Sequence, residues 1–375
     1  MTAPPLRAAC GALPPLTVRA VETVAVTVPM RLALGTSAAT VREAPLLLID
    51  LLTEEGVVGR SYLFCYRQSG SVAIAAILRE AVGLIAGDRL APAAIAAKLE
   101  RRYALIGVTG VVRMALSALD MALWDAHAVA AGLPLAAMLG AAPRPLPAYN
   151  SCGLGLMEPQ AAADEAELLL DGGFRAVKLR LGHATLAEDL AVTRAVRRRL
   201  ADHIAVMVDY NQALTVAEAM ARGHALAGEG VYWIEEPIRH DNVDGYARLA
   251  CALALPVQIG ENFDGAKAMT AALDAAACDF VMPDAGRIGG VTGWLQAAGV
   301  AASRDVEMSS HLLPEASAHL LAATPTAHWL EYVDWANAIL AEPLAIRDGC
   351  AVASSRPGTG IAWNHDAVAR YRTDH

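Results

Sequence analysis

The chain has 375 residues, of which 55% are hydrophobic and 18% charged, and its formal net charge at pH 7 is −9. That length is enough for about two domains with sizeable cores. A mildly acidic chain without a basic block excludes nucleic acid and anionic membrane surfaces as main partners. The basic residues are almost all arginines, and the only lysines are Lys98, Lys178 and Lys267. A lone lysine therefore carries more weight here than a lone arginine.

The N-terminal segment and the cysteines indicate a cytoplasmic protein. Residues 1–15 are rich in proline and have no sustained apolar core, which predicts a disordered lead-in rather than a signal peptide. No uninterrupted apolar run is long enough to span a membrane. The six cysteines show no C-x-x-C spacing, which predicts reduced thiols.

The first part of the chain changes from strand-like to helical patterns. Residues 17–64 contain TVRAVETVAVTV, APLLLIDLLT and VVGRSYLF, the last two flanking a hairpin turn at 54–56. The intervening segment MRLALGTSAATVRE predicts a covering loop over residues 30–43. Residues 71–139 have a helical period. Strands followed by helices predict an α+β capping domain over residues 16–143.

After Pro145 short apolar segments alternate with alanine-rich helical stretches. The apolar segments are, in order, LPAYNS, FRAVKLR, IAVMVDYN, VYWIEEP, PVQIGEN, DFVMPD, VEMSSH and AHWLEY. Eight such segments predict a modified (β/α)-barrel over residues 144–340. Residues 341–375 lack a helical period in their first part and are predicted to return to the capping domain.

Charged residues end most of these predicted strands at regular intervals. They are Lys178, Asp209, Glu235, Glu261, Asp284, His311 and Glu331. The successive intervals of 31, 26, 26, 23, 27 and 20 residues each match about one βα unit. Because the carboxyl ends of barrel strands converge on one mouth, these side chains are predicted to surround one cavity.

The acidic members of this group predict a metal site. Three carboxylates from adjacent strands repel one another unless a cation holds them together. A set of hard oxygen ligands without cysteine or histidine favours one Mg²⁺ over zinc. Lys178 and His311 come from early and late strands, so they are expected on opposite sides of the metal.

The motifs MVDYNQ, WIEEP, GEN, MPDAGRIGGVTGW and SSHLLPEASAHLLAATPTAHWLE resemble the enolase superfamily, and specifically its mandelate racemase subgroup. The resemblance extends from about Val21 to Trp363. It implies an Mg²⁺-dependent enzyme that removes the α-proton of a small carboxylate substrate, and a homo-oligomer. It implies that the Mg²⁺ ligands are Asp209, Glu235 and Glu261, and that His311, paired with Asp284, is the general base or acid. It implies that Glu331 is a hydrogen-bonding acid and Lys178 a cation, both beside the substrate carboxylate. Ser151 and Asn211 are implied to help hold the substrate.

One position departs from the family pattern. The family's K-x-K motif, whose second lysine is a base on the other face of the substrate, is Lys178-Leu179-Arg180 here. Arginine keeps its proton at neutral pH and is a poor general base. Racemisation needs proton transfer on both faces, whereas dehydration of a sugar acid can use His311 in turn as base and acid. On this argument dehydration is favoured, and a catalytically inactive binding protein is a further possibility.

The predicted lining of the cavity favours racemisation instead of dehydration. The covering loop supplies Leu32, Leu34, Ala38, Ala39 and Val41, the hairpin supplies Phe64 and Tyr66, and Leu312 follows the histidine. This lining suits an alkyl or aryl 2-hydroxy acid better than a polyol, although Arg31, Thr36, Ser37 and Thr40 are polar. Together with the whole-chain resemblance, it makes a racemase or isomerase of a 2-hydroxy acid the first choice and an acid-sugar dehydratase the close alternative.

Overall fold

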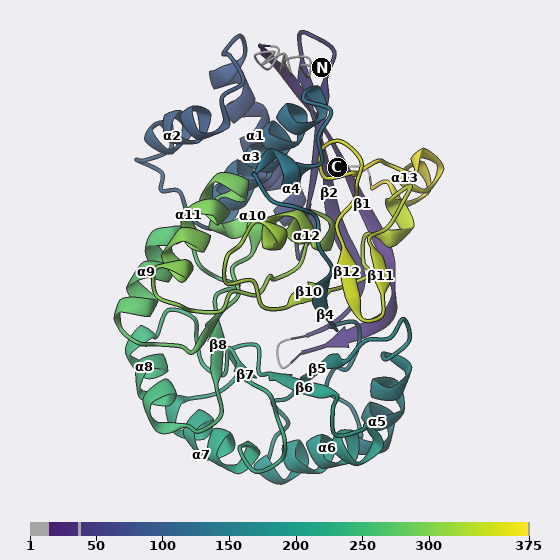
Figure 1. Ribbon diagram of the computed structural model, residues 1–375, viewed down its shortest axis with the longest axis vertical. Coiled ribbons are helices and arrows are strands. Elements are labelled where there is room, and N and C mark those ends of the chain that lie inside the picture. The colour runs from purple at the N-terminus through teal and green to yellow at the C-terminus, as the bar shows by residue number, and fades with distance from the viewer. Residues whose placement is uncertain (1–14, 37–38, 374–375) are drawn as a thin grey trace, which may run out of the picture.

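The computed structural model describes residues 15–36 and 39–373. The lead-in predicted over residues 1–15 therefore lies outside the described residues, apart from Pro15. The chain forms a capping domain at one end and a barrel at the other (Figure 1).

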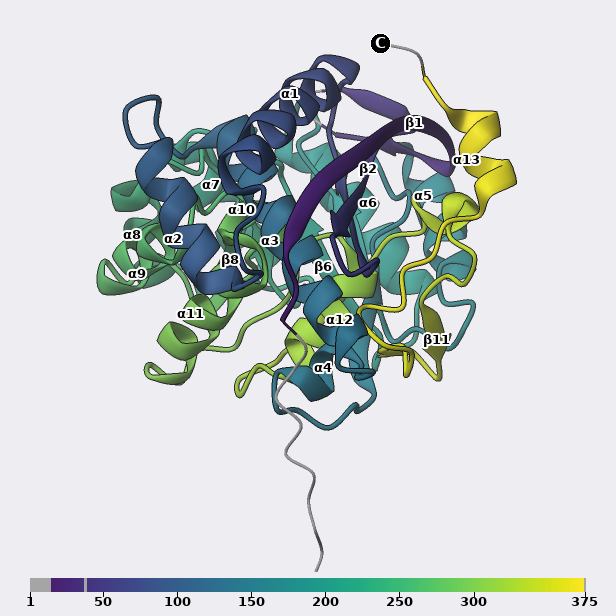
Figure 2. The same cartoon turned by 90° about the horizontal axis from the view of Figure 1, so that it is seen from above.

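The capping domain is a three-stranded antiparallel sheet covered by helices. The sheet has the order β1-β2-β3. Its elements are β1 (Val18–Gly35), β2 (Thr40–Thr53), β3 (Val58–Phe64), α1 (Gln68–Ile85), α2 (Pro92–Arg102), α3 (Gly110–Ala130) and α4 (Leu135–Met138). Figure 2 shows α1, α2 and α3 on one side of the β1–β2 ribbon and the C-terminal helix α13 (His365–Tyr371) on the other.

Helix α1 is long and apolar enough to cross a membrane by length and composition alone. It carries a stripe of buried residues, including Ile74, Leu78, Ala81 and Ile85, and it packs on α3 and the sheet. This spacing of three and four residues is that of a helix that covers a core.

The segment predicted as a loop over residues 30–43 is for the most part a two-stranded ribbon. Strands β1 and β2 stay paired as far as Gly35 and Thr40, with a register shift between Pro29 and Leu34. The ribbon reaches the barrel, where the Leu156 N–H donates to the Gly35 carbonyl at 3.1 Å. A Cβ on Gly155 would overlap the backbone of Gly35, so this close approach requires glycine. The loop prediction failed because pairing between two segments satisfies the backbone whatever their local composition.

The barrel contains alternating strands and helices, as predicted. Its parallel strands are β4 (Leu146–Asn150), β5 (Ala176–Arg180), β6 (Ala205–Asp209), β7 (Ile234–Glu235), β8 (Val257–Ile259), β9 (Phe280–Val281) and β10 (Leu330–Tyr332). Its helices are α5 (Pro159–Leu168), α6 (Leu186–Arg199), α7 (Val216–Leu226), α8 (Val243–Ala252), α9 (Ala266–Asp274), α10 (Ala285–Ile288), α11 (Gly290–Ala302) and α12 (Pro314–Ala322). In Figure 1 the helices α5 to α9 form an arc around the strands.

Strands β4 to β9 pair in sequence order, and β10 pairs with β4. The segment VEMSSH was predicted as a strand, but in the described chain it makes only single bridges. Met308 bridges Val281 on one side and Ala327 on the other. These bridges still complete the ring between β9 and β10, so the fold is the predicted α+β cap with a modified barrel.

The C-terminal segment contacts both parts of the molecule. Its elements are η1 (Asn337–Ile339), β11 (Ala345–Arg347), β12 (Cys350–Val352) and α13. Strand β12 pairs with β4 of the barrel, and the Trp363 indole N–H donates to Asp50 of the cap at 2.8 Å. The sequence patterns did not predict α13 or the pairing with β4.

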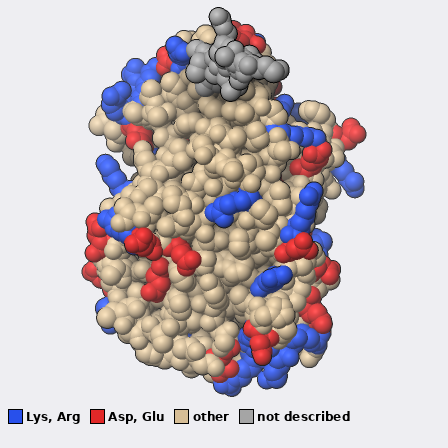
Figure 3. Space-filling view, viewed as in Figure 1, with Lys and Arg blue, Asp and Glu red and all other residues tan. Residues whose placement is uncertain are grey.

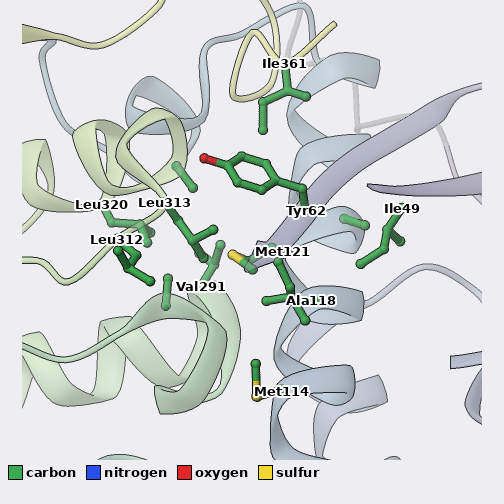
Figure 4. Packing of buried hydrophobic residues seen from close by; sticks show 14 of the residues in the cluster. Ile49, Tyr62, Met114, Ala118, Met121, Val291, Leu312, Leu313, Leu320 and Ile361 are labelled. Carbon is green, nitrogen blue, oxygen red and sulfur yellow. The ribbon is translucent and has the colours of Figure 1, made fainter. Parts of the chain in front are cut away.

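An apolar core joins the cap to the barrel. Tyr62 of β3, Met121 of α3, Leu313 and Ile361 all belong to one buried cluster (Figure 4). The Tyr62 hydroxyl also donates to Glu315 of α12 at 2.6 Å. This packing holds the cap over the barrel. On the face shown in Figure 3, charged side chains of both signs lie mainly near the edges.

Candidate active site

The register of the barrel strands brings the predicted residues together at one end. Arg180 of β5 pairs with Asp209 of β6, and Asp209 pairs with Glu235 of β7. Parallel pairing in this register aligns the carboxyl ends of the strands. The next strand ends continue the ring with Glu261 after β8, Asp284 after β9 and Glu331 on β10.

Lys178 lies among three carboxylates. Its Nζ is 3.3 Å from Asp209 Oδ2, 2.6 Å from Glu235 Oε1 and 2.8 Å from Glu331 Oε1. The lysine side chain is 1% exposed. Burial lowers the pKa of Lys178, but the surrounding carboxylates outweigh burial and raise it well above its usual value. Lys178 is therefore a fixed positive charge in this arrangement.

Glu235 is an acid whose surroundings favour its protonated form. Its pKa is raised to about 8 overall: burial is the largest cause, Lys178 opposes it, and the charges of Asp209 and Glu331 act in the same direction as burial. The second oxygen of Glu235 accepts from the Trp233 indole at 3.1 Å. A further positive charge at this point would stabilise the ionised carboxylates.

His311 and Asp284 form the predicted pair on the other side of the mouth. His311 Nδ1 lies 2.8 Å from Asp284 Oδ2, and Asp284 Oδ1 accepts from the Gly286 N–H at 2.6 Å. The Asp284 carboxylate accepts a hydrogen bond from Nδ1–H, which directs Nε2 toward the cavity, where Glu261 Oε2 lies at 3.1 Å. Burial lowers the pKa of His311, but the charges of Glu261 and Glu331 outweigh burial and raise this pKa well above its usual value. A cation bound to Glu261 would oppose this effect and lower the pKa of His311, so that Nε2 could accept a proton.

Glu331 is held at both of its carboxylate oxygens. Oε1 accepts from the Ser151 hydroxyl at 2.7 Å and from Lys178, and Oε2 accepts from the Leu312 N–H at 2.8 Å. Burial raises its pKa, but Lys178 and His311 lower it to about 2 overall. In this arrangement Glu331 accepts hydrogen bonds at both oxygens, and its implied role as a hydrogen-bonding acid for the substrate carboxylate stays a prediction.

Arg180 is turned toward the end of β4. Its Nη1 donates to the carbonyls of Ser151 and Gly153 at 2.9 and 2.8 Å, and its Nη2 donates to the Ser151 hydroxyl at 2.8 Å. The residue is 3% exposed. Arg180 therefore anchors Ser151, which in turn binds Glu331. Ser151, predicted to hold substrate, is buried behind the cavity wall.

The residues at the mouth fit one divalent cation. Four carboxylates lie at this mouth, those of Asp209, Glu235, Glu261 and Glu331; Lys178 contacts three of them and His311 contacts Glu261. Carboxylate oxygens are the donors that Mg²⁺ prefers. Within residues 15–36 and 39–373 no three acidic, histidine or cysteine side chains already converge as a metal cage. Lys178 holds Asp209 and Glu235, whereas His311 holds Glu261.

A cavity of about 730 Å³ opens above these groups. Its wall includes the predicted residues Leu34, Val41, Asn211 and Leu312, together with Ala39, Phe64 and Tyr66. Ala38 and Ser37 lie outside the described residues. The Asn211 amide N–H₂ donates to Asp209 at 3.0 Å, so Asn211 also holds that carboxylate. The cavity size suits a small organic acid.

Several residues at the site were not singled out from the sequence. Trp335 lines the cavity and its ring centroid lies 4.9 Å from that of Phe64. Glu236, Asn262 and Arg287 form a hydrogen-bonded chain beside Glu261. The last three lie within the motifs WIEEP, GEN and MPDAGRIGG, so their positions were visible although no role was assigned to them.

A (β/α)-barrel with acidic residues at the ends of consecutive strands, closed by an α+β cap, defines the enolase superfamily of Mg²⁺-dependent enzymes. The family profile described as mandelate racemase / muconate lactonizing enzyme, N-terminal domain matches residues 18–140. The profile described as enolase C-terminal domain-like matches residues 161–367. The chain belongs to the mandelate racemase/muconate lactonizing enzyme family, which confirms the resemblance.

Known proteins of this family resemble the chain over most of its length. The L-talarate/galactarate dehydratase of Salmonella typhimurium is 32% identical over 87% of this chain and 82% of its own. A magnesium-bound enolase structure from alpha proteobacterium BAL199 has a TM-score of 0.93 and 44% identity, covering 96% of this chain and 100% of the other.

A Bradyrhizobium enolase complexed with magnesium and mandelic acid has a TM-score of 0.92 and 41% identity, covering 96% of this chain and 99% of the other. These relatives confirm that the protein is an enzyme and that its cofactor is Mg²⁺, and they remove the support for a non-catalytic binding protein.

Proposed function

We propose that the enzyme removes the α-proton of a 2-hydroxy carboxylate with His311 as its single base and then expels a β-hydroxyl group, giving a 2-keto acid. The observation that carries this proposal is the placement of Arg180. Its guanidinium donates to three acceptors at the end of β4, and such a group does not exchange protons at neutral pH. One face of the substrate therefore has a base and the opposite face has none.

In the proposed reaction Asp209, Glu235 and Glu261 hold the metal. Mg²⁺, when bound, supplies positive charge that stabilises the second negative charge developing on the substrate carboxylate. Lys178 adds a fixed positive charge at the same end of the substrate. Such charges lower the barrier because they are in place before the reaction begins.

His311 transfers the proton at Nε2. The Cα–H bond breaks and its proton passes to Nε2, while Asp284 keeps the ring oriented through Nδ1. The Cβ–O bond then breaks, and the Nε2 proton passes to the departing oxygen to form water. The resulting enol tautomerises to a 2-keto acid. This sequence needs the β-hydroxyl on the same face as His311.

Racemisation of a 2-hydroxy acid is the second candidate, and one observation favours it. Phe64, Tyr66 and Trp335 form an aromatic side of the cavity, joined by Leu34 and Val41. An aryl or alkyl substituent would pack well there. The mandelic acid in the Bradyrhizobium relative agrees with this chemistry, whereas the dehydratase of Salmonella typhimurium agrees with the first.

The two reactions are separated by a substrate panel in D₂O with MgCl₂. The panel should contain both enantiomers of mandelate, together with aldonates and aldarates, and the products should be scored separately for 2-keto acid and for enantiomer. We expect 2-keto acid from a 2,3-dihydroxy acid, and its loss in His311→Asn. Interconversion of mandelate enantiomers without any keto acid from the panel would instead establish the racemase.

A further inference from the structure

Arg287 connects three parts of the molecule beside the active site. It lies on α10, three residues after Asp284. Its Nη1 donates to Asn262 Oδ1, at the end of β8. Its guanidinium also lies 5.0 Å from the centre of the Tyr66 ring, which belongs to the cap. The proposed reaction assigns no role to this arginine.

The contact with Arg287 fixes the orientation of the Asn262 amide. A guanidinium has only donors, so Asn262 must present its oxygen to Arg287 and its N–H₂ group to the other side. There Nδ2 donates to Glu236 Oε2 at 2.9 Å and to Glu261 Oε1 at 3.2 Å. With Asn262 holding Oε1 and His311 near Oε2, the carboxylate of Glu261 is held at both oxygens.

On the cap side Arg287 supports a residue with an unusual backbone. Tyr66 has φ of 61°, in the left-handed region that a bulky side chain rarely adopts. Its ring contacts Arg287 and also Phe64, whose ring centroid is 4.6 Å from that of Tyr66. A cation held against an aromatic face stabilises such an arrangement. Tyr66 also lines the cavity, so the same contact shapes its wall.

We propose that Arg287 is a positioning residue that orients Glu261 for Mg²⁺ through Asn262 and links Mg²⁺ binding to the cap through Tyr66. The inference rests on the proposed assignment of Glu261 as a metal ligand. Partners that hold a ligating carboxylate are part of a metal site, since a free carboxylate must be ordered when the metal binds. Because the Tyr66 contact and bound Mg²⁺ would favour the same position of Arg287, packing of the cap should strengthen Mg²⁺ binding, and Mg²⁺ binding should strengthen the contact with the cap.

Isothermal titration of the full chain with MgCl₂ tests the inference without a substrate. Arg287→Met and Asn262→Ala should each weaken Mg²⁺ binding by about 10- to 100-fold. Arg113→Met is the matched control, because Arg113 is also largely buried and is also held by a side-chain hydrogen bond, in its case to Glu100. It should leave Mg²⁺ binding unchanged. Thermal unfolding checks that each variant is folded, and Asn262→Ala tests the proposal alone if Arg287→Met does not fold.

The Tyr66 variants test the link to the cap. Tyr66→Ala should weaken Mg²⁺ binding about two- to fivefold, the value of an exposed cation–π contact, and Tyr66→Phe should bind as the wild type does. Unchanged binding in Tyr66→Ala would overturn the coupling to the cap. Unchanged or tighter binding in Arg287→Met and Asn262→Ala would overturn the positioning role, since the Arg287 charge would then only repel the metal. Glu261→Gln separates the two proposals: if it binds Mg²⁺ normally, the ligand assignment itself is wrong.

Discussion

Replacing Arg180 by lysine tests the one-base reaction directly. The structure gives Arg180 three hydrogen bonds to the end of β4. Lysine keeps the charge but offers a single nitrogen, so it cannot span the carbonyls and the hydroxyl as the guanidinium does. Leaving one or two buried acceptors unpaired should lower the free energy of unfolding by about 1–3 kcal/mol. An amine in this position can, however, lose its proton and serve as a base.

The substitution should also change how fast the enzyme exchanges the α-proton of each enantiomer of a 2-hydroxy acid. A positioned general base accelerates proton removal by about 10²- to 10⁴-fold. In the wild type we therefore expect α-proton exchange to be at least about 10²-fold faster for the enantiomer whose proton faces His311. Arg180→Lys should reduce this ratio at least about tenfold by raising exchange of the slow enantiomer.

The assay follows the loss of the Cα–H signal of each pure enantiomer in D₂O by ¹H NMR with MgCl₂ present, using an acid selected from the panel. His311→Asn is the control and should abolish exchange of the fast enantiomer. Comparable exchange of both enantiomers by the wild type would refute the reasoning, because a second base would then have to exist.

Two further predictions concern stability. Lys178→Met leaves Asp209, Glu235 and Glu331 buried without their shared cation, so the free energy of unfolding in urea should fall by about 3–5 kcal/mol. Added MgCl₂ should restore part of this loss, and an unchanged free energy of unfolding without Mg²⁺ would contradict the role of Lys178. Burial lowers the pKa of His319 to about 4, below its value in the unfolded chain. The contribution of neutral His319 to the free energy of unfolding is therefore complete above about pH 6.5 and is lost as the pH falls toward 4. Between pH 7 and pH 5 this loss should be about 2 kcal/mol. His319→Gln should reduce that loss in urea titrations at the two pH values, and an equal loss in wild type and variant would refute the assignment.

The sequence predicted the barrel and the members of the site because both depend on local patterns. Short apolar segments alternate with helical stretches, and each charged strand end follows directly from where its strand stops. This spacing was enough to predict that Asp209, Glu235 and Glu331 lie together at one mouth of the barrel. The cap sheet was predicted for the same reason.

The ribbon of β1 and β2 and the orientation of Arg180 depend on contacts between distant segments. Gly35 and Thr40 pair although their neighbours are typical of a loop. The acceptors of Arg180 include the backbone carbonyls of Ser151 and Gly153, which every residue possesses and which leave no mark in a sequence. The role of Arg287 likewise depends on Tyr66, which lies more than two hundred positions away in the chain.

The direction in which each cation of β5 turns decides the chemistry of the site. Lys178 and Arg180 are two residues apart, so they leave the strand on the same face, and in the sequence they look equivalent. Lys178 turns toward the carboxylates of β6 and β7, at the end of the cavity where the substrate carboxylate is proposed to bind. Arg180 turns toward neutral acceptors at the end of β4, which hold it without competing for its protons. A guanidinium held in this way can keep Ser151 and Glu331 in place, but it cannot take a proton from a substrate. The reaction that follows is therefore expected to begin and end on the face of His311.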